Sequence, residues 1–220
     1  MVEDITRRWE SLKLTKEEQE EITLPDKVVL SYNIKGELCL LAKIFNYRTA
    51  NREAFKTTMS KIWNTEGWLT FKELETNQFL IEFQLHSDKQ KVLQGRPWSF
   101  DRHLVCMKEL EGILSLSEVH FLTEPFWIQV HNLPFAGMNK EMGMLVGAGL
   151  ERVLEVEVDI EGYGWGSFSR IKAEVNVTKP LVRGHFLKFG NKQSWLSFKY
   201  ERLPISVSSV GASCTRKEFV

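Results

Sequence analysis

The sequence has few cysteines, no long apolar run and no excess of charge of either sign. Its three cysteines lack the paired spacing of a disulfide framework, and Cys39 and Cys106 lie in apolar runs where we expect reduced, buried thiols. No run of eighteen apolar residues occurs, so we expect no membrane-spanning helix. The first residues, Met1–Asp4, are acidic and no apolar segment follows them, so we expect no secretory signal. These features predict an intracellular protein, nuclear or cytoplasmic.

The charges balance. Lys and Arg total 29, and Asp and Glu total 29, so the net charge is zero. Proteins that bind nucleic acid usually carry a basic excess that neutralises phosphates, so any basic surface here must be local. Residues 31–110 hold twelve Lys or Arg against nine Asp or Glu, which is a small excess.

Patterns that would indicate catalysis are missing. No Ser-His-Asp arrangement, paired carboxylates or Cys-x-x-Cys motif stands out, and the five histidines are far apart in the sequence. The glycine-rich stretch Gly162–Gly166 lacks the Lys-Ser/Thr pair of a phosphate-binding loop. We therefore expect a protein that is not an enzyme and has no small-molecule substrate.

Hydrophobic periodicity predicts an α+β protein with a ferredoxin-like, RNA-recognition-motif-like (RRM-like) domain at residues 31–110. The predicted order is β-α-β-β-α-β, which is the split-βαβ arrangement. Its elements are Leu38–Ile44, helix Asn51–Trp63, Trp68–Leu74, Gln78–Gln84, helix Ser87–Gln94 and Trp98–Met107. We expect both helices on one face of a four-stranded antiparallel sheet. Residues 5–24, within an N-terminal segment 1–30, are predicted to be helical, with a capping box from Thr15 to Glu18.

A second, mainly antiparallel unit is predicted at residues 125–204, after a linker around Glu111–Glu124. Two glycines, Gly143 and Gly147, lie one turn apart in its helix and indicate close packing on the sheet. No internal repeat of fixed period is visible. The predicted elements are Trp127–Asn132, helix Met138–Leu150, Val153–Ile160, Ser169–Val177, Gly184–Phe189 and Ser194–Tyr200.

Two segments resemble the strands with which RRMs bind RNA. Ile128–Leu133 has the first-strand pattern apolar-x-apolar-x-Asn-Leu, and Asn77–Phe83 occupies the place of the third strand, whose aromatic residues stack on bases. The third-strand segment lacks the leading basic residue and glycine. Alternation also allows Phe79, Ile81 and Phe83 to face the helices, which leaves Leu80, Glu82 and Gln84 on the open face.

Clusters of basic residues near aromatic residues are candidates for contact with nucleic acid, and the alternative is a solvated face of mixed charge. The candidates are Arg48, Arg52, Lys89, Lys91, Arg96, Arg102, Lys179 and Arg183.

Four runs, in this order and spacing, resemble one plant family that is known only as a domain of unknown function. They are Gly95–Val105, Trp127–Pro134, Val177–Leu181 and Tyr200–Pro204. The resemblance covers about residues 30–204. The family occurs in LINE-type retroelement proteins and their domesticated relatives, usually ahead of a Cys-x2-Cys-x4-His-x4-Cys zinc knuckle. It implies a gag-like role in binding RNA or single-stranded DNA.

The knuckle itself is degenerate in this chain. The family's ligand positions fall on Ser206, Ser209, Cys214 and Phe219. Zinc needs three or four thiolate or imidazole donors, and one thiol cannot hold it. We expect no zinc and no other cofactor, and we expect residues 205–220 to be a poorly packed knuckle remnant.

The sequence therefore predicts a retrotransposon-derived, gag-like protein that binds RNA or single-stranded DNA weakly. Self-association is a further possible interaction. The alternative is a protein-interaction or scaffold domain without contact to nucleic acid. A basic patch on one sheet face would favour the first interpretation, and an apolar patch on that face would favour the second.

Overall fold

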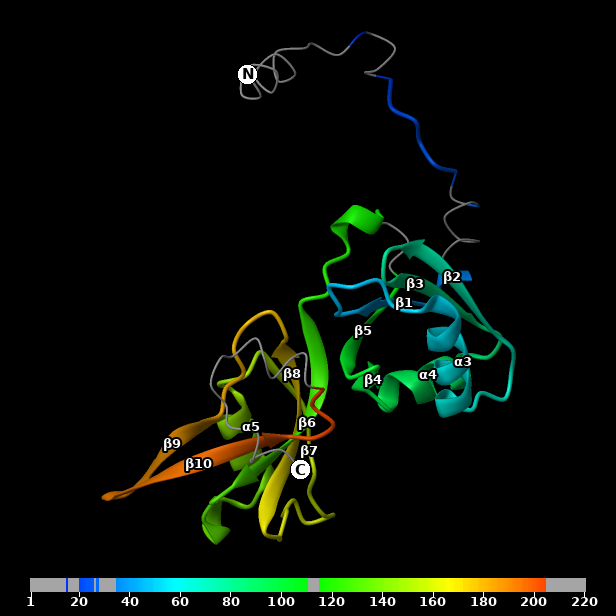
Figure 1. The fold of residues 1–220 in the computed structure, drawn as a ribbon. Coiled ribbons are helices and arrows are strands. Elements are labelled where there is room, and N and C mark those ends of the chain that lie inside the picture. Colours follow the sequence, from blue (N-terminus) through cyan, green and yellow to red (C-terminus); the bar gives the residue numbers. More distant parts are fainter. Residues whose placement is uncertain (1–14, 16–19, 26, 28–34, 111–114, 205–220) are drawn as a thin grey trace.

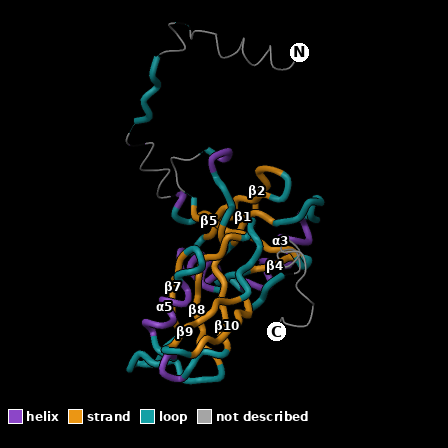
Figure 2. Tube along the Cα trace, turned by 90° about the vertical axis from the view of Figure 1, so that its left-hand side faces the viewer, coloured by secondary structure: helices purple, strands orange, loops and turns teal. Residues whose placement is uncertain are grey.

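The computed structural model describes residues 15, 20–25, 27, 35–110 and 115–204. In this part of the chain, two five-stranded antiparallel sheets form two units that follow one another along the molecule (Figures 1 and 2). The α+β class predicted from the sequence is confirmed.

The first unit has the ferredoxin-like order of elements. It contains β1 (Cys39–Ile44), α3 (Arg52–Trp63), β2 (Leu69–Glu75), β3 (Gln78–Phe83), α4 (His86–Gln94), β4 (Trp98–Phe100) and β5 (His103–Glu109). The strand order is β2-β3-β1-β5-β4, with every pair antiparallel. Both helices cover the same face, as predicted (Figure 1).

Local sequence explains how α3 begins and which side it buries. The Asn51 side chain accepts a hydrogen bond from the Ala54 amide at 3.0 Å and caps the helix N-terminus. Phe55, Met59 and Trp63, spaced four residues apart, are buried against the sheet. They join Phe79, Ile81 and Phe83 of β3 in one core. The interpretation in which these β3 residues face the helices is therefore confirmed, and they offer no stacking platform.

The predicted strand Trp98–Met107 is wrong as a single element. It is a hairpin of β4 and β5, because Asp101 and Arg102 both have positive φ (48° and 63°) and reverse the chain in two residues. The first sheet therefore has five strands instead of four.

The second unit contains β6 (Thr123–His131), α5 (Lys140–Gly147), β7 (Arg152–Val156), β8 (Phe168–Asn176), β9 (Gly184–Phe189) and β10 (Lys192–Tyr200). Its strand order, β7-β8-β6-β10-β9, repeats that of the first sheet when strands are numbered within each unit. An element corresponding to α4 is not present, since residues 177–183 connect β8 to β9 without a helix.

Several predicted boundaries in the second unit need correction. β6 begins at Thr123, inside the predicted linker, and a short 3-10 helix, η1 (Leu116–Glu118), precedes it. The helix predicted to span residues 138–150 is only Lys140–Gly147, because Asn139 caps its start by accepting a hydrogen bond from the Met142 amide. The strand predicted to reach residue 160 ends at Val156.

The close packing predicted for the two helix glycines is confirmed. A Cβ on Gly143 would lie 2.5 Å from Val156 Cγ1, and one on Gly147 would lie 2.3 Å from Val153 Cγ2. The absence of side chains at these positions lets α5 lie directly on β7 and β8.

The N-terminal helical prediction falls mostly on residues that are not described, including Glu18 of the capping box. Where the chain is described, residues 20–24 are not helical, so that part of the prediction is wrong. The degenerate knuckle positions Ser206, Ser209, Cys214 and Phe219 lie outside the described residues. None of the helices in the described part is long and apolar enough to cross a membrane.

Candidate nucleic-acid interface

The face of the first sheet that points away from α3 and α4 is buried within the molecule. Leu41 of β1 and Leu104 and Cys106 of β5 belong to the same apolar core as Phe126 of the second unit. Lys43 lies over the ring of Phe121, with Nζ 5.9 Å from the ring centroid. This is the face on which an RRM stacks bases, and here it is occupied by the chain itself.

Polar contacts fix the two units to each other at the same place. Glu124 at the start of β6 is fully buried, and its Oε2 accepts a hydrogen bond from the Met107 amide of β5 at 3.1 Å. Arg96 Nε lies 3.9 Å from its Oε1. Burial raises the pKa of Glu124 to about 8, although Arg96 and the Met107 amide act in the opposite direction. A carboxylic acid that is neutral near pH 7 is thus part of the contact between the sheets.

The second sheet has one face against α5 and leaves the other face partly exposed. Phe126, Ile128 and Val130 point to the core, so the alternating residues Trp127, Gln129 and His131 point to the open face.

The neighbouring strands continue this open face in register. His131 is paired with Phe168 of β8 on one side and with Ser197 of β10 on the other. The rings of His131 and Phe168 are 5.2 Å apart between centroids. In the next row, Gln129 is paired with Arg170 and with Lys199. Across β8, β6 and β10, the first of these rows therefore carries Phe168, His131 and Ser197, and the second carries Arg170, Gln129 and Lys199.

Arg170 is held in place at the centre of this face. Its guanidinium lies 4.0 Å from the ring centroid of Trp127 and makes ion pairs at 2.9 Å with Glu201 and 3.0 Å with Glu157. The hydrogen bonds from Arg170 lower the pKa of Glu201. Two carboxylates therefore neutralise this cation and keep its plane fixed over the indole.

The β9–β10 hairpin carries the uncompensated positive charge of this unit. Residues 184–200, which form the hairpin, contain Lys188, Lys192 and Lys199 and no Arg, Asp or Glu. Within the described part of the chain, neither Lys188 nor Lys199 has a carboxylate within ion-pair distance. The ring centroids of Phe186 and Trp195 lie 4.8 Å apart on the open face, and the two side chains are 67% and 43% exposed. We call the side chains of Phe168, His131, Trp195, Phe186, Lys188 and Lys199 on this open face the ring face; Trp195, Phe186 and Lys188 are exposed and the other three are half-buried.

The ring face has a partial match to the stacking positions of an RRM. In the shared strand order, β6 and β8 occupy the places of the first and third RRM strands. Ser167–Ile171, at the start of β8, aligns with the third-strand pattern, so that Phe168 falls on one stacking position and Arg170 on the other. Gln129 stands where the first strand usually has an aromatic residue. One of three stacking positions is aromatic, and an arginine plane, which also stacks on bases, takes the second.

Sequence reasoning found the first-strand segment, Ile128–Leu133, but sought its third-strand partner in the first unit, at residues 77–83. The signal that could have found β8 is that both segments must belong to one sheet. Phe168–Ile171 lies two strands after Ile128–Leu133, as the third strand does in the split-βαβ order.

Three of the eight predicted basic residues hold the first unit together. Lys89 is buried, pairs with Glu109 at 2.8 Å and donates to the Glu37 carbonyl. Lys91 donates to the Asn64 carbonyl at the end of α3, and Arg96 donates to the carbonyls of Leu93 and Met107.

The other five lie apart from one another. Arg52 pairs with Glu53 and Glu73, Lys179 lies 3.6 Å from Glu151, and Arg48 is exposed next to Tyr47. Arg102 lies in the β4–β5 turn. Arg183, just before β9, is exposed and precedes the ring face. The structure therefore forms no single patch from the eight residues, and their contact with nucleic acid stays a prediction.

Among the described residues, no group of three or more His, Cys, Asp or Glu side chains is arranged to hold a metal ion. Cys39 and Cys106 are buried free thiols, as expected. Burial is the main reason that the pKa of both thiols is raised, and nearby carboxylates act in the same direction.

The fold and the ring face define an α+β protein with an RRM-like strand order in both units. Residues 35–115 match the family model of a domain of unknown function (DUF4283). No curated protein matches the sequence.

Several solved structures are similar to parts of the chain, including the following two. One is the Caenorhabditis elegans NONO-1 homodimer, at 15% identity over 64% of this chain and with a TM-score of 0.26. The chain spans half the length of the NONO-1 chain. The other is the first two RRM domains of the yeast poly(U) binding protein Pub1, at 12% identity over 61% of this chain and 81% of that one, with a TM-score of 0.25.

Proposed function

We propose that the chain binds single-stranded nucleic acid, RNA or DNA, on the ring face of its second unit. The single observation that carries this proposal is the meeting of exposed aromatic rings with lysines that have no carboxylate partner in the described part of the chain. Bases stack on such rings whatever their identity, and the lysines neutralise phosphates. In this proposal the protein is gag-like and retroelement-derived, needs no metal or cofactor, and carries out no catalytic step.

The binding is expected to be weak and to depend on salt. Arg170 is already neutralised by two carboxylates, so few cations remain to release counterions from the nucleic acid. Each phosphate contact contributes a slope of about −0.7 to a plot of log K against log salt for a single strand. If two or three phosphates are contacted, raising the salt concentration from 50 to 200 mM should therefore lower the affinity by roughly one order of magnitude.

The test is fluorescence anisotropy with a labelled single-stranded RNA, the matching DNA strand and the matching duplex. Trp195→Ala should weaken single-strand binding roughly 5- to 150-fold, which corresponds to the loss of about 1–3 kcal/mol for one stacked base. Lys199→Gln should reduce the salt slope by about one phosphate contact.

The hairpin offers a matched control for this experiment. Phe189 is 59% exposed on the same hairpin, but its place in the strand alternation puts it on the opposite face from Phe186. Phe189→Ala should leave the affinity unchanged, whereas Phe186→Ala should lower it. Equal effects of these two substitutions, or no binding by the unaltered chain at 50 mM salt, would contradict the proposal and favour a protein-interaction domain.

A further inference from the structure

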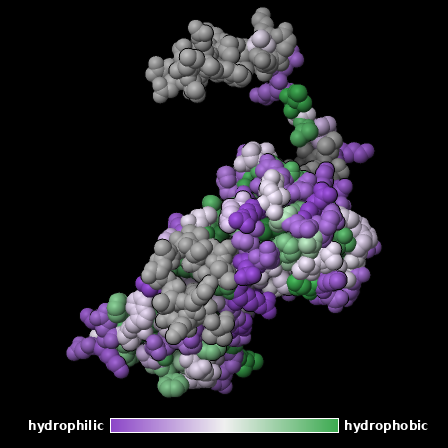
Figure 3. Space-filling view, in the orientation of Figure 1, coloured by the Kyte–Doolittle hydropathy of each residue, from purple (hydrophilic) through white to green (hydrophobic). Residues whose placement is uncertain are grey.

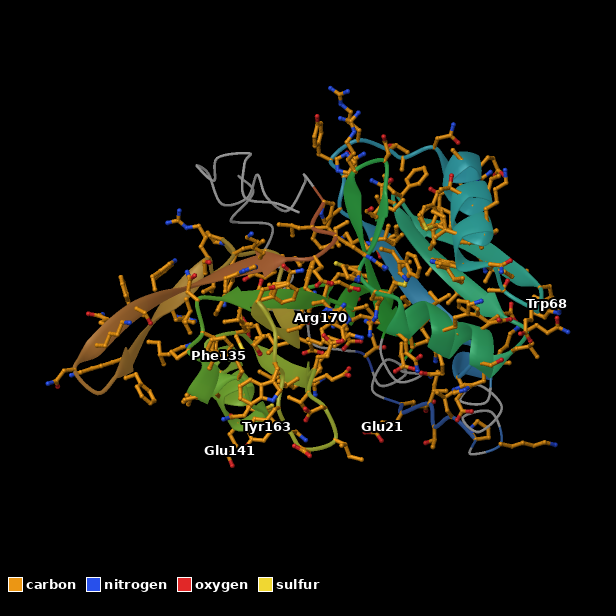
Figure 4. The ribbon with its side chains drawn as sticks, turned by 90° about the horizontal axis from the view of Figure 1, so that it is seen from below. Glu21, Trp68, Phe135, Glu141, Tyr163 and Arg170 are labelled. Carbon is orange, nitrogen blue, oxygen red and sulfur yellow. The ribbon has the colours of Figure 1, made fainter. Side chains whose placement is uncertain are left out.

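The loop between β7 and β8 presents aromatic side chains to solvent at the edge of the second sheet opposite the hairpin. Trp165 is 61% exposed and stacks on Tyr163, with ring centroids 5.3 Å apart and planes at 15°. Phe135, which follows β6, is 72% exposed, and its ring centroid lies 6.3 Å from that of Trp165. Figure 4 shows that Phe135 and Tyr163 lie near each other in the second unit. Large aromatic side chains exposed as a group on a surface indicate a site of interaction.

Hydrogen bonds hold this loop in one conformation. The Asp159 carboxylate accepts hydrogen bonds from the amides of Glu161 and Tyr163, both at 2.9 Å. The Gly162 carbonyl accepts from the Lys140 amide, and the Gly164 amide donates to the Met138 carbonyl. The rings are therefore positioned before any partner arrives, which reduces the entropy lost on binding.

The rings border a pocket of about 510 Å³ whose lining is aromatic and acidic. Trp165, Tyr163 and Phe168 line it together with Glu157 and Asp159. Residues 153–169 contain four Asp or Glu and no Lys or Arg. Arg170 also lines the pocket and is paired with Glu157 and with Glu201, so Asp159 is the lining carboxylate that has no ion-pair partner among the described residues. A ligand suited to this lining is both cationic and partly apolar, since cations are attracted to aromatic faces and to carboxylates.

The chain itself provides a segment of that chemistry at the end of the β9–β10 hairpin. Lys188, Phe189 and Lys192 surround the tight turn at Gly190, where φ is +60°. The hairpin projects from the body of the molecule (Figure 1), and hydrophilic side chains gather at its end (Figure 3). Phe189 is 59% exposed there.

The hairpin end of one molecule is poorly placed to enter the pocket of the same molecule. β7 and β9 are the two edge strands of the five-stranded sheet. Four spacings of roughly 4.8 Å separate them across the sheet.

We infer that the hairpin end of one copy, Lys188–Lys192, docks in the aromatic and acidic pocket of a second copy. The two surfaces differ, so the contact is head-to-tail and leaves one free pocket and one free hairpin in every dimer. Such an interface builds rings or open chains. A single hairpin end buries little surface, which places the contact among weak and transient interfaces.

The experiment is sedimentation of the full chain without nucleic acid over a wide range of protein concentration. The unaltered chain should form dimers and longer species as its concentration rises. Lys188→Glu combined with Lys192→Glu removes the cationic hairpin end, and Trp165→Ala removes a pocket wall. Each of these two variants alone should associate at least tenfold more weakly. Trp68→Ala, which removes a half-exposed tryptophan from the first unit, should associate like the unaltered chain.

Mixing the two altered chains distinguishes a head-to-tail contact from any other. The Trp165→Ala chain keeps its hairpin, and the Lys188→Glu/Lys192→Glu chain keeps its pocket, so the mixture should form a dimer of one copy of each and nothing longer. A mixture that stays monomeric, a variant that associates undiminished, or an unaltered chain that is monomeric throughout would overturn the inference. Because no nucleic acid is present, these outcomes are independent of the function proposed for the ring face.

Discussion

The two sheets share one strand order but differ in what covers the face away from their helices. In the first unit that face is buried against the linker and the second unit, and in the second unit it is open. The burial patterns reflect this difference. β1 is buried at nearly every residue, whereas β8 alternates strictly between buried and half-buried residues. An RRM-like topology alone therefore does not indicate where a ligand can bind, since only one of the two sheets leaves that face accessible.

The units also differ in how they cover their helical face. The first has α3 and α4, while the second has only α5 and closes its core with the segment 177–183 and β9. Leu181, Val182 and Leu187 pack against the second core from this side. The hydroxyl of Tyr200 donates a hydrogen bond to the Val182 carbonyl at 2.7 Å, which fixes the segment where a second helix would lie.

The largest expected effect tests the buried face of the first sheet. Leu41→Ala should lower the free energy of unfolding by about 2–5 kcal/mol, because it leaves a cavity between the two units. Phe186→Ala on the open face of the second sheet should change it by no more than about 0.5 kcal/mol. Denaturant titration of both variants measures the difference, and similar losses would show that the two faces are equally buried in solution.

A second prediction concerns Glu124 between the sheets. Its folded pKa of about 8 lies above the usual value of 4.5, so the folded state keeps a proton that the unfolded state releases between these values. The stability from this group is therefore present below about pH 4.5 and is lost as the pH rises toward 8. The charges of Arg96 and Glu174 act in opposite directions on the pKa of this carboxyl: Arg96 lowers it and Glu174 raises it.

Glu124→Gln should reduce this loss, so that the variant is more stable than the parent chain at pH 8 and close to it at pH 5. Thermal unfolding across this range is the measurement, with Glu141→Gln on exposed α5 surface as the control. If the stability of the parent chain does not fall relative to that of the Gln variant between pH 5 and pH 8, Glu124 is not held neutral in the folded protein.

The smallest expected effect tests the replacement of the missing helix. Tyr200→Phe removes the hydrogen bond to Val182 and should lower the free energy of unfolding by about 1 kcal/mol. Hydrogen exchange should become faster in residues 177–183 and remain unchanged in α4. Tyr47→Phe, at an 87% exposed position, is the control. If hydrogen exchange in the Tyr200→Phe variant became faster by the same factor in both units, the Tyr200–Val182 hydrogen bond would not stabilise residues 177–183 in particular.

The periodicity of the sequence predicted the first unit well, because its elements have strong local signals. Asn51 caps α3, and Phe55, Met59 and Trp63 repeat at helical spacing. The split between β4 and β5 was missed because Asp101-Arg102 lacks the glycine that usually marks a two-residue turn. The sequence also did not predict that the face of the first sheet away from its helices is buried. Leu41 and Leu104 on that face pack against residues of the second unit that are distant in the sequence.

The candidate site was harder to predict, because the sequence does not show on which face of a sheet a charged or aromatic side chain lies. That depends on the strand to which the residue belongs and on the pairing of that strand. Lys89 and Arg96 resemble surface cations in the sequence, yet their contacts are to backbone carbonyls and carboxylates of the same unit. Trp195 and Phe186 lie nine residues apart and meet only because β9 and β10 pair in that register. The two units share one strand order, but their sequences are not repeats of each other. The shared order could therefore not be found from the sequence.

The zero net charge conceals a separation of charge along the second sheet. The acidic segment 153–169 includes most of the edge strand β7, and the basic segment 175–200 includes the other edge strand, β9, so the unit carries a permanent electric dipole across its strands. A polyanion at a distance greater than any contact exerts a torque on such a dipole and turns the hairpin toward itself. The orientation in which the protein first meets a charged surface is therefore selected before contact, and this selection weakens as added salt shortens the range of the field.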